Sequence, residues 1–220
     1  MQPWFASRWY QLSYWLSAGA MTLWFSLRTE GHRHVPRQGP ALLIANHQSF
    51  LDPVLIGLAA RRPLCFLARR TLFGNPFFAW LISSLNAVPI NQEGFARDGL
   101  KTILEQLEAG RAVVVFPEGE RSTDGKLQPL RPGIHLLIKR MAMPIVPVGI
   151  AGAFDAWSRW SPIPIPAPVF LPPERGTLAV SIAPPVDSRR FAGLPRQDVI
   201  NCLVEELQKA AARAENLRRK

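Results

Sequence analysis

ALLIANHQSFLDP, residues 41–53, runs from a short apolar stretch straight into polar side chains. The stretch at 41–46 carries no charge and follows a Gly-Pro pair, which predicts a buried central strand. Asp52 followed by Pro53 is typical of a helix N-cap and first turn, so a helix should begin there. His47 then lies in a loop at the carboxyl end of a strand, where α/β folds place their ligand sites.

The same alternation of strand and helix continues along the chain. Apolar or periodic stretches predict further strands at 63–69, 111–116, 144–150 and 177–186, and helices at 53–60, 95–109, 133–140 and 197–220. Such a pattern indicates an α/β fold, a single domain with a largely parallel central sheet flanked by helices. The proline-rich stretch at 158–173 should form an irregular surface segment.

The N-terminal part of the chain is aromatic and uncharged between residues 9 and 27. Its length approaches the roughly 20 residues of a spanning helix, but Gln11, Ser13 and further hydroxyl side chains interrupt it. Because the aromatic residues are spread along the segment, one or two helices lying in the bilayer surface are favoured over a single span or a buried first helix. We therefore predict a membrane-associated helical segment at 1–30 and a main domain at 31–220.

The composition limits the classes of function. Hydrophobic residues make up 48% of the chain, which argues against intrinsic disorder, and the net charge is +10. A basic excess suits anionic membranes, phosphate-bearing ligands or nucleic acid. No nucleic-acid motif accompanies the dispersed arginines, so a nucleic-acid partner is not expected. The cysteines and histidines lack the spacing of metal ligands, and no metal site is predicted.

His47 and Asp52 allow two interpretations. In one, Asp52 only caps the helix and His47 is an ordinary loop histidine. In the other the two form a dyad, in which the carboxylate fixes the imidazole tautomer while the second ring nitrogen takes a proton from a bound hydroxyl. The dyad needs no serine or cysteine nucleophile, because the acceptor hydroxyl is itself the nucleophile.

VVVFPEGERS, residues 113–122, is a second strand that ends in a polar turn. Gly119 permits close approach of the backbone to a ligand, Glu118 offers an acceptor for hydroxyl or amide donors, and Arg121 offers a fork for phosphate. The alternative is a plain surface turn with an internal Glu–Arg pair.

Together the two stretches resemble the glycerolipid acyltransferase family, typified by the lysophosphatidate (1-acyl-sn-glycerol-3-phosphate) acyltransferases. The resemblance covers roughly residues 31–155. Its first block, Asn-His with four residues between the histidine and an aspartate, matches Asn46, His47 and Asp52. The remaining blocks match FLARRTLFGNPFFAWLISSLNAVPINQ at 66–92, FPEGERS at 116–122 and IVPVGI at 145–150.

The resemblance implies a glycerol-3-phosphate acyltransferase-like fold for 31–220 and transfer of a fatty acyl group from acyl-CoA or acyl-carrier protein to lysophosphatidic acid, giving phosphatidic acid. It makes His47 the general base and Asp52 the residue that orients it. The other implied site residues bind or shape the acceptor: Glu118 and Gly119 at its pocket, Arg121 at its phosphate, Arg69 (or the neighbouring Arg70) also at the phosphate, and Ser49 as a further substrate contact. Apart from the thioester donor, no cofactor and no metal is implied.

Two alternatives stay open beside this expectation. The acceptor could be another lysolipid, such as a lyso-aminolipid or lysophosphatidylglycerol, or the chain could be a non-catalytic protein that binds anionic lipid. The expected partners are an anionic phospholipid membrane, a lysophospholipid acceptor and the acyl-carrier protein, at the cytoplasmic face of the inner (plasma) membrane. Glu120 departs from the family pattern, in which threonine is frequent at this position.

Overall fold

One mixed sheet forms the centre of the computed structural model, which describes residues 8–90, 98–170 and 177–218. The strands are β1 (Arg28–Glu30), β2 (Ala41–Ala45), β3 (Cys65–Arg69), β4 (Ala87–Ile90), β5 (Ala112–Val115), β6 (Pro144–Ala151), β7 (Ala179–Ile182) and β8 (Val186–Asp187). Their order is β1-β7-β6-β2-β5-β3-β4, with β8 paired to β6. The strands from β6 to β4 in this order are parallel, whereas β7 and β8 run antiparallel to β6.

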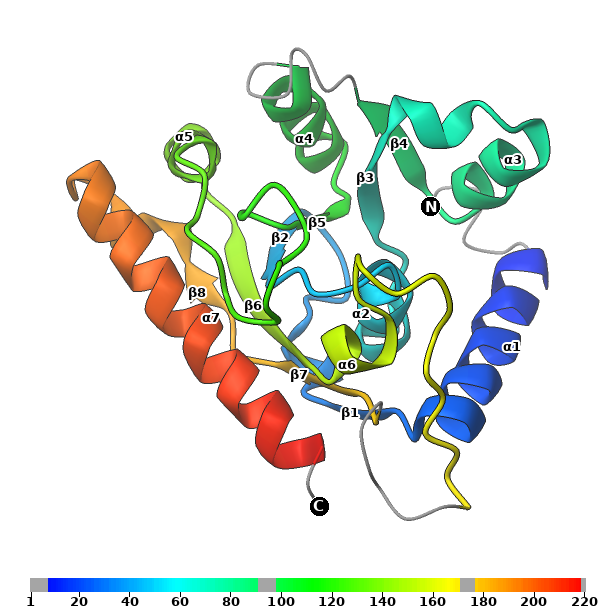
Figure 1. Cartoon of the computed structure of the whole chain (residues 1–220). Helices are drawn as coiled ribbons and strands as arrows, with labels where there is room; N and C mark the ends of the chain where they lie inside the picture. Colours follow the sequence, from blue (N-terminus) through cyan, green and yellow to red (C-terminus); the bar gives the residue numbers. More distant parts are fainter. Residues whose placement is uncertain (1–7, 91–97, 171–176, 219–220) are drawn as a thin grey trace.

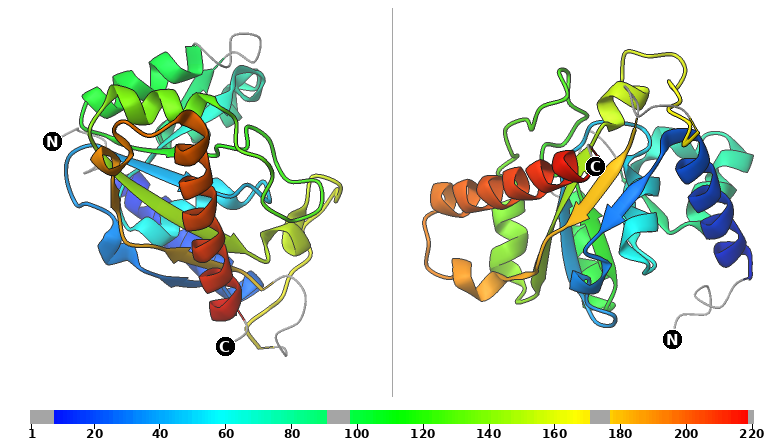
Figure 2. Two further views of the ribbon diagram at one scale, coloured as in Figure 1. Left: turned by 90° about the vertical axis from the view of Figure 1, so that its left-hand side faces the viewer. Right: turned by 90° about the horizontal axis from the view of Figure 1, so that it is seen from below.

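Helices cover both faces of the sheet (Figures 1 and 2). The α-helices are α1 (Arg8–Phe25), α2 (Asp52–Ala60), α3 (Pro76–Ser84), α4 (Asp98–Glu108), α5 (Gly133–Arg140), α6 (Ala153–Trp157) and α7 (Arg196–Arg218), and short 3-10 turns are η2 (His32–His34), η3 (Arg70–Phe73) and η4 (Ser188–Phe191). The predicted α/β class, with a mostly parallel central sheet flanked by helices, is confirmed.

The alternation of side chains along β2 explains the two layers of core. Leu43 packs with Leu55 of α2 on one face of the sheet, whereas Leu42 and Ile44 pack with Leu207 of α7 on the other. All five residues of β2 are buried, as expected of a parallel strand covered on both faces. The predicted strand at 41–46 is thus confirmed within one residue.

Strand β6 and helix α7 pack closely at Gly149. A Cβ atom at this position would lie 2.1 Å from the backbone of Ala210, so only glycine lets the helix approach the strand this far. This contact seats the long C-terminal helix across the sheet, as Figure 2 shows. The helix predicted at 197–220 is confirmed over its described part, and the predicted helix at 133–140 has the bounds of α5.

Three predictions differ from the structure. Asp52 is not the N-cap of α2: it occupies the first helical position, Leu51 precedes it, and its carboxylate faces the loop before the helix. Strand β1 lies inside the predicted N-terminal segment, yet it pairs with β7 in the sheet. Strand β4 and helix α3 were not predicted as separate elements. The start of the helix predicted at 95–109 falls outside the described residues.

In the described part of the N-terminal segment, residues 8–25 form one helix, α1, against the side of the domain. Phe25 is the one residue of this helix that is buried, although Met21 and Leu27 also touch the core. Within the described parts of the chain, no helix combines the length and the apolar character that a bilayer crossing requires.

Candidate active site

The two polar turns meet because their strands are neighbours. β2 and β5 pair in parallel with Ile44 opposite Val115, so both strands end at the same edge of the sheet. The turns that follow, at 46–52 and 116–122, therefore leave the sheet side by side. β3 and β6 flank this pair, and their carboxyl ends lie at the same edge. Residues from all four family-like blocks are thereby brought to one place.

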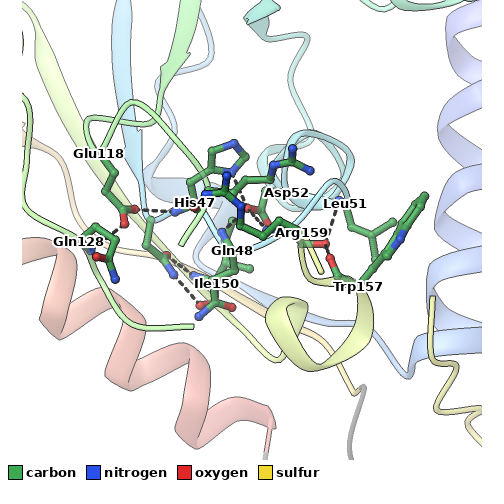
Figure 3. A network of polar contacts seen from close by, with 12 residues as sticks. His47, Gln48, Leu51, Asp52, Glu118, Gln128, Ile150, Trp157 and Arg159 are labelled. Atoms are coloured by element: carbon green, nitrogen blue, oxygen red, sulfur yellow. Dashed lines mark hydrogen bonds and ion pairs between the residues drawn. The ribbon is translucent and has the colours of Figure 1, made fainter. Parts of the chain in front are cut away.

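His47 and Asp52 are in contact. The imidazole Nδ1 lies 2.7 Å from Oδ2 of Asp52, and the carboxylate is fully buried while 18% of the histidine side chain is exposed (Figure 3). The imidazole also stacks on Phe116, with ring centroids 3.9 Å apart and planes at 16°. The ring is thus held at one nitrogen and along one face.

The carboxylate of Asp52 determines which ring nitrogen carries the proton. Oδ2 also accepts hydrogen bonds from the backbone N–H of Gln48 at 2.6 Å and of Ser49 at 2.8 Å. Because Oδ2 already accepts from two backbone N–H groups, it is the acceptor for Nδ1 of His47 as well, and Nδ1 is the donor in this contact. Nε2 then carries the lone pair and is the ring nitrogen that can take up a proton.

The turn at 116–122 holds the backbone of His47 on both sides. Glu118 Oε1 accepts from the N–H of His47 at 2.6 Å, and the N–H of Ser122 donates to the carbonyl of His47 at 2.7 Å. Glu118 Oε2 accepts from the N–H of Gln128 at 2.7 Å. Burial raises the pKa of Glu118 to about 7, against the effect of these backbone hydrogen bonds, which lower it. Through its hydrogen bond to His47, Glu118 links the turn at 116–122 to the turn at 46–52.

Three residues predicted to contact or shape the acceptor make contacts within the protein. Both carboxylate oxygens of Glu118 are used by backbone N–H groups. Gly119 has a φ of 81°, which a turn residue with a side chain rarely adopts, and a Cβ there would press on Arg131 at 3.1 Å. Ser49 is fully buried, and its hydroxyl donates to the carbonyl of Trp157 at 2.6 Å.

Asn46 joins the first turn to β6. Its side chain donates to the carbonyl of Ile150 at 3.0 Å and accepts from the N–H of the same residue at 2.8 Å. These two hydrogen bonds satisfy the donor and the acceptor of the buried Asn46 amide, whose burial without partners would destabilise the fold. It also places the segment that follows β6 beside the histidine loop.

Guanidinium groups gather next to the dyad. Arg121 lies over the ring of Phe50, with its Cζ 3.5 Å from the ring centroid. Burial lowers the pKa of Arg121, and the positive charges of Arg159 and Arg69 lower it further. The three cations come from the ends of β5 and β3 and from the segment after α6. A positive field of this kind suits a phosphate group.

Glu120 does not pair with Arg121, contrary to the alternative of a plain turn with an internal ion pair. Among the ion pairs of the described residues, its carboxylate contacts Arg131 and Arg159, each at 3.4 Å. The guanidinium of Arg121 is thus left facing Phe50 and the histidine side of the site.

Arg159 was missed by the sequence reasoning. It donates to the carbonyl of Arg121 at 3.1 Å, although 38 residues separate the two. The one available signal was an arginine between two tryptophans in WSRW at 157–160, which no family-like block covers. Phe116 belongs to the family-like block at 116–122, but its stacking on His47 depends on the fold.

Comparison with known proteins agrees with the motifs. The family model described as Acyltransferase matches residues 26–151. A chloroplastic 1-acyl-sn-glycerol-3-phosphate acyltransferase of Brassica napus is 32% identical over 51% of this chain, but the match spans 33% of that relative. The same-named protein of Bacillus subtilis is 21% identical, over 92% of this chain and 97% of its own length. The chain thus spans about a third of the plant relative and nearly all of the Bacillus one.

A solved structure has the same fold. The crystal structure of the 1-acyl-sn-glycerophosphate acyltransferase from Thermotoga maritima superimposes with a TM-score of 0.76, at 24% identity, over 96% of this chain and 85% of that chain. The family match covers more than half of the chain and includes both polar turns. This chain belongs to the acyltransferase family.

Proposed function

We propose that this protein transfers a fatty acyl group from an acyl thioester, acyl-CoA or acyl-carrier protein, to the free hydroxyl of lysophosphatidic acid, giving phosphatidic acid. The observation that carries the proposal is the contact between His47 and Asp52 beside the cations Arg121, Arg69 and Arg159. The names of the relatives from Brassica napus and Bacillus subtilis support the same acceptor.

In the proposed mechanism His47 is the general base. Its Nε2 takes the proton from the acceptor hydroxyl while Asp52 stabilises the imidazolium that forms. The hydroxyl oxygen attacks the thioester carbonyl, the carbon–sulfur bond then breaks, and the imidazolium returns the proton to the thiolate. The new ester and a free thiol leave the site, and His47 is neutral again.

The cations favour a phosphate-bearing acceptor over the alternatives. A phosphate monoester carries more negative charge than the phosphodiester of lysophosphatidylglycerol or the amine-bearing headgroup of a lyso-aminolipid, so it gains more from several guanidinium groups. A purely lipid-binding protein has no physical need for a buried carboxylate that fixes a histidine tautomer. The dyad therefore favours an enzyme.

The proposed setting is the cytoplasmic surface of an anionic membrane. Helix α1 exposes Trp15, Leu16 and Trp24, and the net charge of +10 attracts acidic lipid. An amphiphilic acceptor resides in such a membrane, so an enzyme attached to its surface meets the substrate there.

The test is acyl transfer from a radiolabelled thioester to a panel of lysolipids, with wild type and His47→Ala compared. Loss of a general base should lower the rate by about 10²–10⁴-fold. We expect lysophosphatidic acid to be the preferred acceptor and the variant to be folded but inactive. No transfer to any lysolipid by wild type, or equal rates in both proteins, would refute the proposal.

A further inference from the structure

Exposed apolar side chains gather on one side of the molecule. Of the eighteen large hydrophobic residues exposed in the described part of the chain, fifteen belong to three segments: α1, the η3–α3 stretch and the irregular segment at 158–170. We call these three segments together the apolar face. Its exposed members are Trp9, Leu12, Trp15, Leu16, Leu23, Trp24, Leu72, Phe77, Phe78, Trp80, Trp160, Ile163, Ile165, Val169 and Phe170.

The three segments form one surface although they are far apart in sequence. Trp9 of α1 lies against Trp80 of α3, with ring centroids 5.2 Å apart, and also donates to Ser84. At the other end of α1, the N–H groups of Ala167 and Val169 donate to helix carbonyls at 2.8 and 3.1 Å. Figure 1 shows α3, α1 and the yellow segment along one side, opposite α7.

The charged residues of the three segments have one sign. The stretches 8–27, 69–84 and 157–170 contain no Asp or Glu, whereas they contain Arg8, Arg69, Arg70 and Arg159. An apolar surface of this size on a soluble monomer marks an interaction site. The three segments carry only basic charges of their own, although Glu120 pairs with Arg159 beside them, and they are rich in tryptophan and phenylalanine. The partner that fits is therefore an anionic lipid surface.

We infer that α3 and the segment at 158–170 insert together with α1 into the headgroup and upper acyl region of an anionic lipid monolayer. The inference extends the proposed function, which requires membrane attachment of α1 alone. Prolines at 162, 164, 166 and 168 alternate with apolar residues in the segment. Proline lacks a backbone donor, so each one removes an N–H group that would otherwise lose its water on insertion.

The position of this segment connects the membrane to the site. Near its start, the guanidinium of Arg159 donates to the backbone carbonyl of Arg121, and the indole N–H of Trp160 donates to the carbonyl of Thr123 at 3.1 Å. Phe50 of the histidine turn packs against Trp157, the residue just before the segment, with ring centroids 5.2 Å apart. Seated in this way, the protein holds its cations at the depth of lipid headgroups, where the phosphate of a lysolipid lies.

The experiment is flotation with phosphatidylglycerol-containing vesicles, using the full chain and no substrate. One variant combines Ile163→Ser with Phe170→Ser, residues that are 70% and 74% exposed, and a second carries Phe77→Ser, which is 71% exposed. The matched control is Leu136→Ser, an exposed leucine of α5 outside the apolar face. Because these side chains contact mainly water, thermal melting should show all variants folded.

We expect the double variant to lower the vesicle partition coefficient by about tenfold or more and Phe77→Ser by a smaller factor, since each large apolar side chain that leaves water contributes to binding. Leu136→Ser should bind as wild type does. Unchanged binding of the face variants, or an equal loss in the control, would overturn the inference. Unchanged vesicle binding with loss of a dimer in sedimentation would also overturn it and would make the face an interface between copies.

Acyl transfer to detergent-dispersed acceptor separates this inference from the proposed function. Because the face variants leave the dyad and the cations intact, they should transfer acyl groups in detergent at the wild-type rate and lose activity on vesicles. A wild-type protein that binds vesicles but transfers no acyl group in detergent would refute the proposed enzymatic function and would leave the inferred membrane insertion unaffected.

Discussion

The two polar turns are fixed by many specific hydrogen bonds, whereas the apolar face has few contacts with the rest of the protein. In the turns, Asp52 accepts three hydrogen bonds at one oxygen and Glu118 joins both turns through backbone N–H groups. On the apolar face, α1 buries a single residue and meets its neighbours through a few hydrogen bonds and ring contacts. Proton transfer needs fixed atoms, whereas a fluid lipid surface adapts to any arrangement of apolar side chains. Substitutions in the two regions should therefore separate activity from membrane binding.

The largest effect is expected for Asp52→Asn. The amide cannot hold the His47 tautomer as the carboxylate does, so kcat should fall by about 10²–10⁴-fold, as loss of a general base does. Vesicle binding should stay at the wild-type level, which flotation checks. A variant that keeps wild-type kcat would show that Asp52 only supports the loop.

A smaller and more selective effect is expected for Arg121→Gln. Loss of a charged hydrogen-bond donor should raise KM for lysophosphatidic acid by about 10–100-fold. The KM for a neutral monoacylglycerol acceptor, measured in the same assay, should change little. An equal rise for both acceptors would mean that Arg121 acts through the shape of the site, by its packing on Phe50, and not through the phosphate.

Glu118→Gln should change how stability depends on pH. The pKa of Glu118 is raised to about 7 in the folded protein, so the folded state binds the proton more tightly than the unfolded chain. Proton binding by Glu118 therefore contributes fully to the stability of the folded protein at low pH, and this contribution is lost as the pH rises through about 7. The free energy of unfolding of wild type should fall relative to the variant between pH 5 and pH 8.

Urea unfolding at several pH values measures this difference, since all other titrating groups are common to both proteins. Parallel curves for wild type and Glu118→Gln would show that the carboxylate titrates normally and that burial does not control it.

The smallest effect is expected for Arg159→Gln. Arg159 shares its charge with Glu120, so KM for lysophosphatidic acid should rise by only about two- to fivefold, the range of a partly exposed ion pair. Arg140→Gln, which removes one charge from the exposed end of α5, is the matched control. A similar rise in both variants would attribute the effect to net charge and not to the site.

Some elements could be predicted because their signals are local. The run at 41–46 and the helix at 133–140 carry apolar patterns that match the observed elements. The local sequence of β4 argues against a strand, because it contains Pro89. The strand exists because β4 lies at the end of the sheet order, where an edge strand tolerates proline.

The sequence alone determined the fold class and the two polar turns, and it placed His47 five positions before Asp52 at the start of one helix, a spacing that allows the contact seen in the structure. Only the tertiary structure decided that Glu118 would bind the backbone of His47, that Arg159 would join Arg121, and that three distant segments would share one apolar face. These contacts depend on which strands are neighbours in a parallel sheet. Strand order is set by packing across the whole core, and no local spacing encodes it.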